Sequence, residues 1–260
     1  MGGALIFLIL GLISTPAGAD PGPAPPPPGE LKPTSFTTRE AFEDRAERLR
    51  QRLEQEEAAG AAAGHLAETH YQLAKFVQSD EEKIDHYQRC LETADAALEQ
   101  NPRSAKAYFF RGLCTGRIGQ LNGLWSSLNR VEPFRRCVEK ALAIDASVAH
   151  GGPHRALGMY YLELPFILGG DVDKSIQHFK AALRLAPEFG QNHYVLALAY
   201  YEQGRYPQAR ESLQRFFQLT SADDPDPELQ KYRKKGRTLL QEIARRLDSR
   251  ESHAPRTENP

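Results

Sequence analysis

A 34-residue period restricts this chain more than any other feature of its sequence. Residues 156–189 and residues 190–223 share one order of large apolar, aromatic, glycine and small residues. A shift of 34 positions superposes Leu162 on Leu196, Phe166 on Tyr200, Gly170 on Gly204, Ser175 on Ala209, Phe179 on Leu213 and Leu185 on Leu219. Self-similarity at this length is typical of helix–turn–helix repeats. A single pair of helices cannot bury its apolar face alone, so neighbouring pairs must stack.

Two less regular copies precede this pair, at about residues 67–102 and 105–147. With these copies the chain resembles the tetratricopeptide (TPR) superfamily over residues 65–223. The resemblance implies an all-α fold, a right-handed superhelical solenoid of about four helix pairs. The copy at 105–147 carries roughly ten extra residues, and insertions of this kind often contact the ligand.

Capping helices are predicted on both sides of the repeats. Residues 37–58 have apolar positions at helical spacing, and Gly60–Gly64 (GAAAG) is expected to form a hinge before the first repeat. After the last repeat, residues 223–227 predict a turn and helix start, followed by an amphipathic helix over 225–248. Residues 249–260 are polar, and we expect a disordered tail.

The first 19 residues predict a secretory signal peptide. Ala4–Ile13 is apolar but too short for a membrane span of about 20 residues, and Ala17-Gly18-Ala19 fits a cleavage site. We therefore expect a periplasmic or secreted protein without a membrane span after cleavage. No Lys or Arg precedes the apolar stretch, so an uncleaved membrane anchor is the alternative. Residues 20–36 are proline-rich and predict a disordered, extended linker.

Composition and motifs favour binding over catalysis. The net charge of −1 gives no reason to expect nucleic acid as a partner. His150 and His154 are separated by glycines and a proline, which break the helix that would align them as metal ligands. We predict that the protein is not an enzyme and that it binds neither a metal ion nor a cofactor. The three cysteines, Cys90, Cys114 and Cys137, are expected to be buried thiols, with one disulfide as the alternative.

An apolar groove is predicted on the concave side, which the first helix of each pair lines in TPR solenoids. The proposed groove residues are Tyr71, Phe109, Leu113, Tyr160, Leu164, Tyr194, Leu198 and Tyr201. They suggest a partner protein or a hydrophobic small ligand. Only Lys75 and Lys106 suggest a clamp for a peptide carboxylate, so we do not expect an acidic tail as the ligand. The alternative is that part of this stripe is core, because periodicity does not separate a groove from a helix interface.

Glycines mark two further places. Gly169 and Gly170 are expected to end one helix, and Asp171 to cap the next. A row of four glycines lies in the insertion, namely Gly112, Gly116, Gly119 and Gly123. The single tryptophan, Trp125, follows this row. The row predicts either a close approach of two backbones or room for a ligand beside Trp125.

A narrower resemblance rests on Leu164-Pro165, Gly169-Gly170-Asp171, Lys174, Phe179, Ala182 and Leu183. These residues are similar to the T component of TRAP transporters, over roughly residues 67–220. That resemblance implies an extracytoplasmic protein, often trimeric, that binds the solute-binding protein of an uptake system. Members of that family are lipoproteins, whereas this N-terminal segment has no cysteine. The alternative function is a structural scaffold for an envelope or secretion complex.

Overall fold

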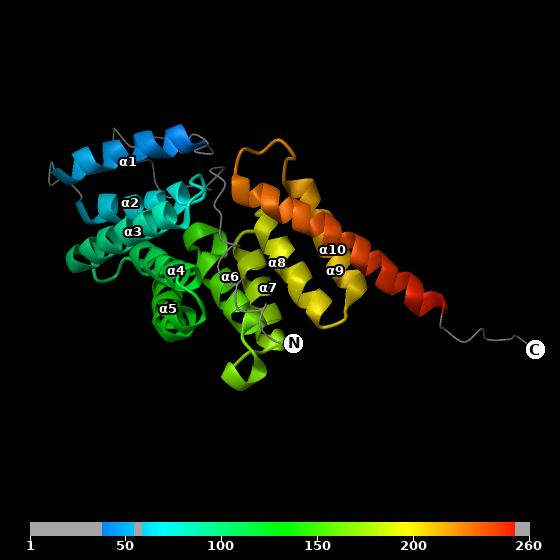
Figure 1. The fold of residues 1–260 in the computed structure, drawn as a ribbon. Helices are drawn as coiled ribbons and strands as arrows, with labels where there is room; N and C mark the ends of the chain where they lie inside the picture. The colour runs from blue at the N-terminus through cyan, green and yellow to red at the C-terminus, as the bar shows by residue number, and fades with distance from the viewer. Residues whose placement is uncertain (1–37, 55–58, 253–260) are drawn as a thin grey trace, which may run out of the picture.

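The computed structural model describes residues 38–54 and 59–252 (Figure 1). These residues form ten α-helices and the short 3₁₀ helix η2. Their bounds are α1 Arg39–Glu54, α2 Ala59–Leu73, α3 Asp80–Gln100, α4 Ala105–Leu121, α5 Leu124–Ile144, α6 Val148–Glu163, η2 Phe166–Leu168, α7 Val172–Leu185, α8 Gly190–Glu202, α9 Tyr206–Leu219 and α10 Pro227–Ser252. The predicted signal peptide, the proline-rich linker and residues 253–260 lie outside the described residues.

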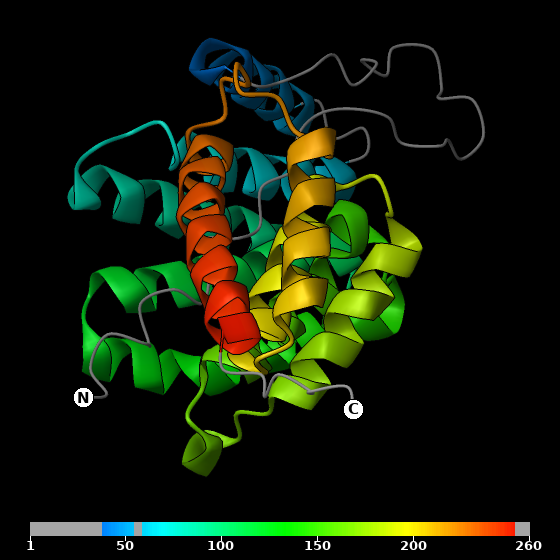
Figure 2. The same cartoon turned by 90° about the vertical axis from the view of Figure 1, so that its right-hand side faces the viewer.

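The helices stack as four consecutive pairs, α2/α3, α4/α5, α6/α7 and α8/α9. The first helices of successive pairs also pack on one another, α2 on α4, α4 on α6 and α6 on α8. We call the side of the solenoid that these four helices form the inner face. Helix α1 packs on α2, and α10 runs beside α9 (Figure 2). The predicted all-α, TPR-like solenoid is confirmed.

The hinge expected at Gly60–Gly64 is wrong, because α2 already begins at Ala59. Alanine has the highest helix propensity, and three consecutive alanines offset the cost of the flanking glycines. Ala62 and Ala63 are buried, where their small side chains let α2 approach its neighbours closely.

The third pair departs from the 34-residue period at one point. Helices α7 and α9 begin 34 residues apart, whereas α6 and α8 end 39 residues apart. The segment between α6 and α7 is therefore five residues longer than the segment between α8 and α9. Phe166, superposed on Tyr200 in the sequence, lies in this longer segment and is exposed, whereas Tyr200 is buried in α8. The true counterpart of Tyr194 on α6 is Arg155 rather than Tyr160.

The extra residues of the second pair lengthen its helices. Helix α5 has 21 residues, whereas α7 and α9 have 14 each. A Cβ added at Gly112 would lie 3.0 Å from Cys137 Cβ, and one at Gly119 would lie 3.2 Å from Ser127 Cα. Gly112 and Gly119 of the glycine row thus serve the close approach of α4 and α5, one of the two alternatives that the sequence left open, whereas a Cβ added at Gly123 would meet nothing within 4 Å. The extra residues form no separate ligand-binding loop.

Arg155 holds a strained turn at the start of α6. Ala149 and His150 have positive φ angles of 50° and 58°, an unfavourable conformation for residues with a Cβ. The Arg155 guanidinium donates to the carbonyl oxygens of both residues at 3.0 Å and to Asn192 Oδ1 at 2.8 Å. Asn192 Nδ2 in turn donates to the carbonyls of His150, Ala182 and Ala186. This buried network ties α6 to α7 and α8.

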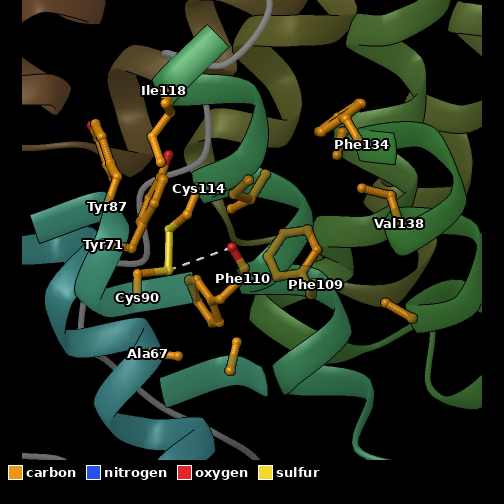
Figure 3. Close-up of a cluster of buried hydrophobic side chains, with 14 of the residues drawn as sticks. Ala67, Tyr71, Tyr87, Cys90, Phe109, Phe110, Cys114, Ile118, Phe134 and Val138 are labelled. Atoms are coloured by element: carbon orange, nitrogen blue, oxygen red, sulfur yellow. Dashed lines mark hydrogen bonds between the residues drawn. A yellow bond between two sulfur atoms is a disulfide. The ribbon is translucent and has the colours of Figure 1, made fainter. Parts of the chain in front are cut away.

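A disulfide joins the first two pairs. Cys90 on α3 is bonded to Cys114 on α4, in a buried cluster that includes Tyr71, Tyr87 and Phe110 (Figure 3). Cys137 is a free, buried cysteine on α5. The expectation of three thiols is therefore wrong, and the alternative with one disulfide holds. The reason is geometric, since the two cysteines face each other across neighbouring helices with Cα atoms 6.4 Å apart.

Candidate functional site

Most of the predicted groove residues are core. Five of the eight are buried, namely Tyr71, Phe109, Leu113, Leu164 and Tyr194. Phe109 packs edge-on against Phe110, and Tyr194 stacks on Tyr232 of α10 with ring centroids 5.3 Å apart. These side chains are buried and cannot contact a partner. The predicted apolar groove is therefore wrong at these five positions. The physical reason is that helix packing and α10 already cover the stripe.

The other three predicted groove residues, Tyr160, Leu198 and Tyr201, are partly exposed. Tyr160 contacts Tyr161 edge-on at 5.2 Å, and Tyr201 contacts Tyr206 at 5.6 Å. Leu198 and Tyr201 border the core around α8 and α9, whereas Tyr160 borders the core of the first two pairs. The three residues do not share one cluster, and their role in a groove stays a prediction.

A cluster of charges closes the inner face. Lys75 follows α2 and Arg117 lies on α4, while Asp226 and Glu228 lie at the start of α10. Lys75 Nζ is 3.4 Å from Asp226 Oδ2 and 3.3 Å from Glu228 Oε2, and Arg117 Nη2 is 2.8 Å from Glu228 Oε1. We call these four residues the inner cluster. Two cations and two carboxylates meet there, and their side chains are at most 17% exposed.

The inner cluster is ordered by its surroundings. Asp226 Oδ1 accepts the backbone N–H groups of Glu228 and Leu229 at 2.7 and 3.2 Å, so this carboxylate caps α10 and binds Lys75 at once. Arg117 Nη2 also donates to the Tyr71 hydroxyl at 3.3 Å. Burial raises the pKa of Tyr71 to about 12, so the hydroxyl stays neutral and accepts this hydrogen bond.

The sequence interpretation missed Arg117, Asp226 and Glu228. Arg117 stands within the glycine row, and the sequence around the acidic residues indicates only a turn and helix start. The sequence suggests Lys75 as a cation for a peptide carboxylate, and the structure places it against two side-chain carboxylates. Lys106, the other cation noted, lies apart from this site and binds Glu68 at 3.1 Å together with Arg45.

Glu163 is a buried carboxylate near the inner cluster. It is the last residue of α6, it is 6% exposed, and neither of its side-chain oxygens has a hydrogen-bond partner. Burial raises its pKa well above the ordinary glutamate value, an effect that the charges of Lys235 and Arg117 only partly oppose. A neutral, protonated carboxyl group is therefore favoured at this position.

The turn before α7 has a structural role. Gly169 has a φ of +96°, a conformation that favours glycine. A Cβ on Gly170 would collide with the carbonyl oxygen of Leu164. Asp171 Oδ1 accepts the Lys174 backbone N–H at 3.0 Å, as predicted for a helix cap. The exposed residues Phe166 and Ile167 project from this turn.

Trp125 does not wall a cavity. Its side chain is 79% exposed at the start of α5. A hollow that the structure does contain lies beside α1, α2 and α3. Its lining is mainly polar and charged, with Arg50, His70, Asp85, Gln88, Arg89, Glu92 and Thr93 beside Leu66. This lining does not fit the hydrophobic small ligand that the sequence suggested.

The two histidines considered as metal ligands have other neighbours. His150 stacks on Phe189 with centroids 4.6 Å apart, and His154 faces His178 instead. Over residues 38–54 and 59–252 no three His, Cys, Asp or Glu side chains gather as metal ligands would. Of the helices described, none has the length and apolarity needed to cross a bilayer.

Two family models match the sequence. The model described as regulator of microtubule dynamics protein 1-3 matches residues 35–164, which is half of the chain. A tetratricopeptide repeat model matches residues 169–224. No curated protein matches the sequence significantly.

Solved structures with a similar fold include a TPR protein. TTC0263, a thermophilic TPR protein from Thermus thermophilus, has a TM-score of 0.57 at 17% identity, with 78% of this chain and 92% of that chain covered. A MamA structure from Desulfovibrio magneticus RS-1 has a TM-score of 0.41 at 20% identity, covering 70% of this chain and 98% of that chain. Yeast Tom70 has a TM-score of 0.33 at 9% identity, covering 81% and 62%.

Proposed function

The chain belongs to the family described as regulator of microtubule dynamics protein 1-3, and we propose that it is a non-catalytic adaptor that binds a partner protein at its inner face. Repeat solenoids bind partners through extended concave surfaces. The observation that carries the proposal is the pair of cations, Lys75 just after α2 and Arg117 on α4, which both face carboxylates. Such an arrangement fits an acidic protein segment.

The family description names a partner that can be tested directly. Co-sedimentation of the full chain with polymerised microtubules, at low and at physiological salt, measures binding to them. Binding that weakens with salt supports a microtubule partner held by charge attraction, because attraction between exposed charges is screened. A chain that stays in the supernatant at both salt concentrations argues against this partner.

We also propose that the chain is exported to the periplasm or secreted. Two observations support export, the Cys90–Cys114 disulfide and the apolar Ala4–Ile13 with its following cleavage-type residues. Disulfides persist mainly in oxidising compartments. Export and a microtubule partner place the chain in different compartments. Cell fractionation together with the mass of the mature protein decides between them.

An accessory role in a TRAP-type uptake system is the second candidate. It is favoured by export and by the turn in which Asp171 caps α7 beside Lys174. Its partner would be a periplasmic solute-binding protein. In this role the chain would also form homo-oligomers and bind a hydrophobic solute. A structural scaffold for an envelope or secretion complex would capture machinery of that complex instead.

The test is affinity capture by the full chain from its own cells, with mass spectrometry of what is retained. Three baits are compared: the natural chain, Arg117→Lys and Arg135→Lys. Arg135 pairs only with Glu132 and Glu139 of its own helix among the contacts described, so it serves as the control. A partner lost with Arg117→Lys and kept with Arg135→Lys supports the adaptor. A partner retained equally by all three, with unchanged melting temperatures, contradicts binding at the inner face.

A further inference from the structure

The inner face already holds an acidic segment, and this segment belongs to the chain itself. Residues 223–228 read DDPDPE and lead into α10. Asp226 and Glu228 from this segment neutralise Lys75 and Arg117, which lie 151 and 111 positions away in the sequence. The contact joins the last helix to the first two pairs. Charge complementarity therefore identifies what this face accepts.

Apolar contacts continue the same binding mode along α10. Leu229 and Tyr232 are both 2% exposed, and Tyr232 stacks on Tyr194. The first turns of α10 thus combine two carboxylates at the helix start with Leu229 and Tyr232 one turn apart. This is the pattern of a helix that binds in a groove through apolar anchors at i and i+3.

The match between α10 and the inner face is incomplete. Glu163, which lies near Lys235 of α10, has two buried oxygens without a hydrogen-bond partner. The Tyr232 hydroxyl and Arg117 Nε are likewise buried and unpaired. Unpaired buried polar groups oppose the state that buries them. A competing segment that pairs some of these groups gains over α10.

We propose that the start of α10, residues 226–232, is a resident ligand of the inner face, and that the partner binds there by displacing it with a segment of the same chemistry. That segment has two carboxylates at a helix start, followed by an aliphatic and an aromatic residue three positions apart. The proposal rests on the proposed function, since it names the kind of partner that the inner face accepts.

The connections of α10 allow such a displacement. Seven residues, 220–226, link α9 to α10. Apolar residues in the second half of α10, which are Leu239, Leu240, Ile243 and Leu247, pack in the core around α8 and α9. Gly236 lies between the two halves, and glycine weakens a helix at its position. The first turns can therefore leave the inner face while the second half stays packed.

The test uses a fluorescent peptide with the sequence of residues 223–236 and the full chain. Fluorescence anisotropy measures binding to the natural chain and to the variant Asp226→Asn plus Glu228→Gln. Asparagine keeps the helix cap, and both changes preserve side-chain shape. We expect the variant to bind the peptide about tenfold more tightly, because its own segment competes less for the site. Glu242→Gln, in the packed half of α10, is the matched control and should bind as the natural chain does.

A second peptide, carrying the same Asp→Asn and Glu→Gln changes, should bind none of the chains. Equal affinity of the acidic peptide for all three chains, or no binding to any, overturns the proposal. If the double variant unfolds, the acidic peptide is added to the natural chain and amide hydrogen exchange is measured. Faster exchange in residues 227–235 then supports displacement, and unchanged exchange overturns it. The two proposals can fail separately. If a captured partner depends on Arg117 but the double variant does not bind the acidic peptide more tightly, the adaptor function is supported and only the resident-ligand proposal is overturned.

Discussion

Arg117 on α4 and Glu228 at the start of α10 lie 111 positions apart in the sequence, yet guanidinium Nη2 and carboxylate Oε1 are 2.8 Å apart. Most contacts in a repeat protein join neighbouring repeats only. This one joins the second helix pair to the final helix. The ends of the solenoid are therefore coupled, and the stability of α10 depends on residues in the first two pairs.

The Arg117–Glu228 pair should contribute strongly to stability. We expect Glu228→Ala to lower the free energy of unfolding by about 3 kcal/mol, because it leaves a buried guanidinium without its carboxylate. Urea denaturation measures the change. Glu132→Ala, which removes an exposed carboxylate on α5, should cost less than about 1 kcal/mol. Similar small losses for both variants would show that the pair is not held as described.

The disulfide should stabilise the chain measurably. Cys90 and Cys114 are 24 positions apart, and a cross-link of this span stabilises by about 3 kcal/mol in the chain-entropy model. Reductant should therefore lower the melting temperature of the natural chain and leave Cys90→Ala plus Cys114→Ala unchanged. Thiol titration in denaturant should find one thiol before reduction, Cys137, and all three cysteines after it. Three thiols in the unreduced protein would contradict the bond.

Two glycines should respond oppositely to alanine. A Cβ on Gly158 would collide with the Phe179 ring, whereas one on Gly64 would meet Ser104 Oγ at an ordinary 3.8 Å. Gly158→Ala should destabilise the chain by about 1 to 3 kcal/mol through overpacking. Gly64→Ala should stabilise it by about 0.5 to 1 kcal/mol, because alanine favours the helix. Thermal unfolding of both variants gives the signs, and equal effects would contradict the packing of α6 on α7.

Glu163 should make stability fall as pH rises. Burial raises the pKa of its carboxyl group well above the ordinary value. The folded chain therefore keeps a proton that the unfolded chain loses once the pH exceeds the ordinary glutamate pKa of about 4.3. Between the pKa of the unfolded chain and that of the folded chain, the free energy of unfolding falls by at most about 1.4 kcal/mol per pH unit.

Glu163→Gln cannot ionise, so it should lack this loss and be more stable than the natural chain near neutral pH. Urea denaturation of both chains from acid to neutral pH gives the difference between them. Taking the difference cancels other titrations, such as that of His178, whose pKa burial lowers to about 4. Parallel stability curves for the two chains would contradict a buried, uncompensated carboxyl group.

The sequence predicted the repeat architecture because that architecture depends on periodicity. Helices α7 and α9 begin and end 34 residues apart, as the period indicates. The same period misplaced α6, because a fixed shift has no means of registering the five added residues before α7. Arg155 was missed for a related reason. It occupies the position of Tyr194, where the pattern leads one to seek an aromatic residue.

The site was less predictable than the fold. Tyr71 and Tyr194 have the spacing of groove residues, but the same spacing serves a helix interface, and here both are buried. Whether α10 covers the inner face depends on the curvature of the whole solenoid, which no local pattern contains. The pairing of Lys75 with Asp226 spans 151 positions and follows from that curvature. Sequence reasoning could assign each charge to its helix but not to its partner.

Amide hydrogen exchange at the start of α10, with and without a bound acidic helical segment, tests the central claim most directly. The account predicts faster exchange over residues 227–235 when the segment binds, together with slower exchange around Lys75 and Arg117. It also predicts unchanged exchange over the second half of α10. Binding that leaves residues 227–235 as protected as before would contradict the claim that α10 and the partner share the inner face.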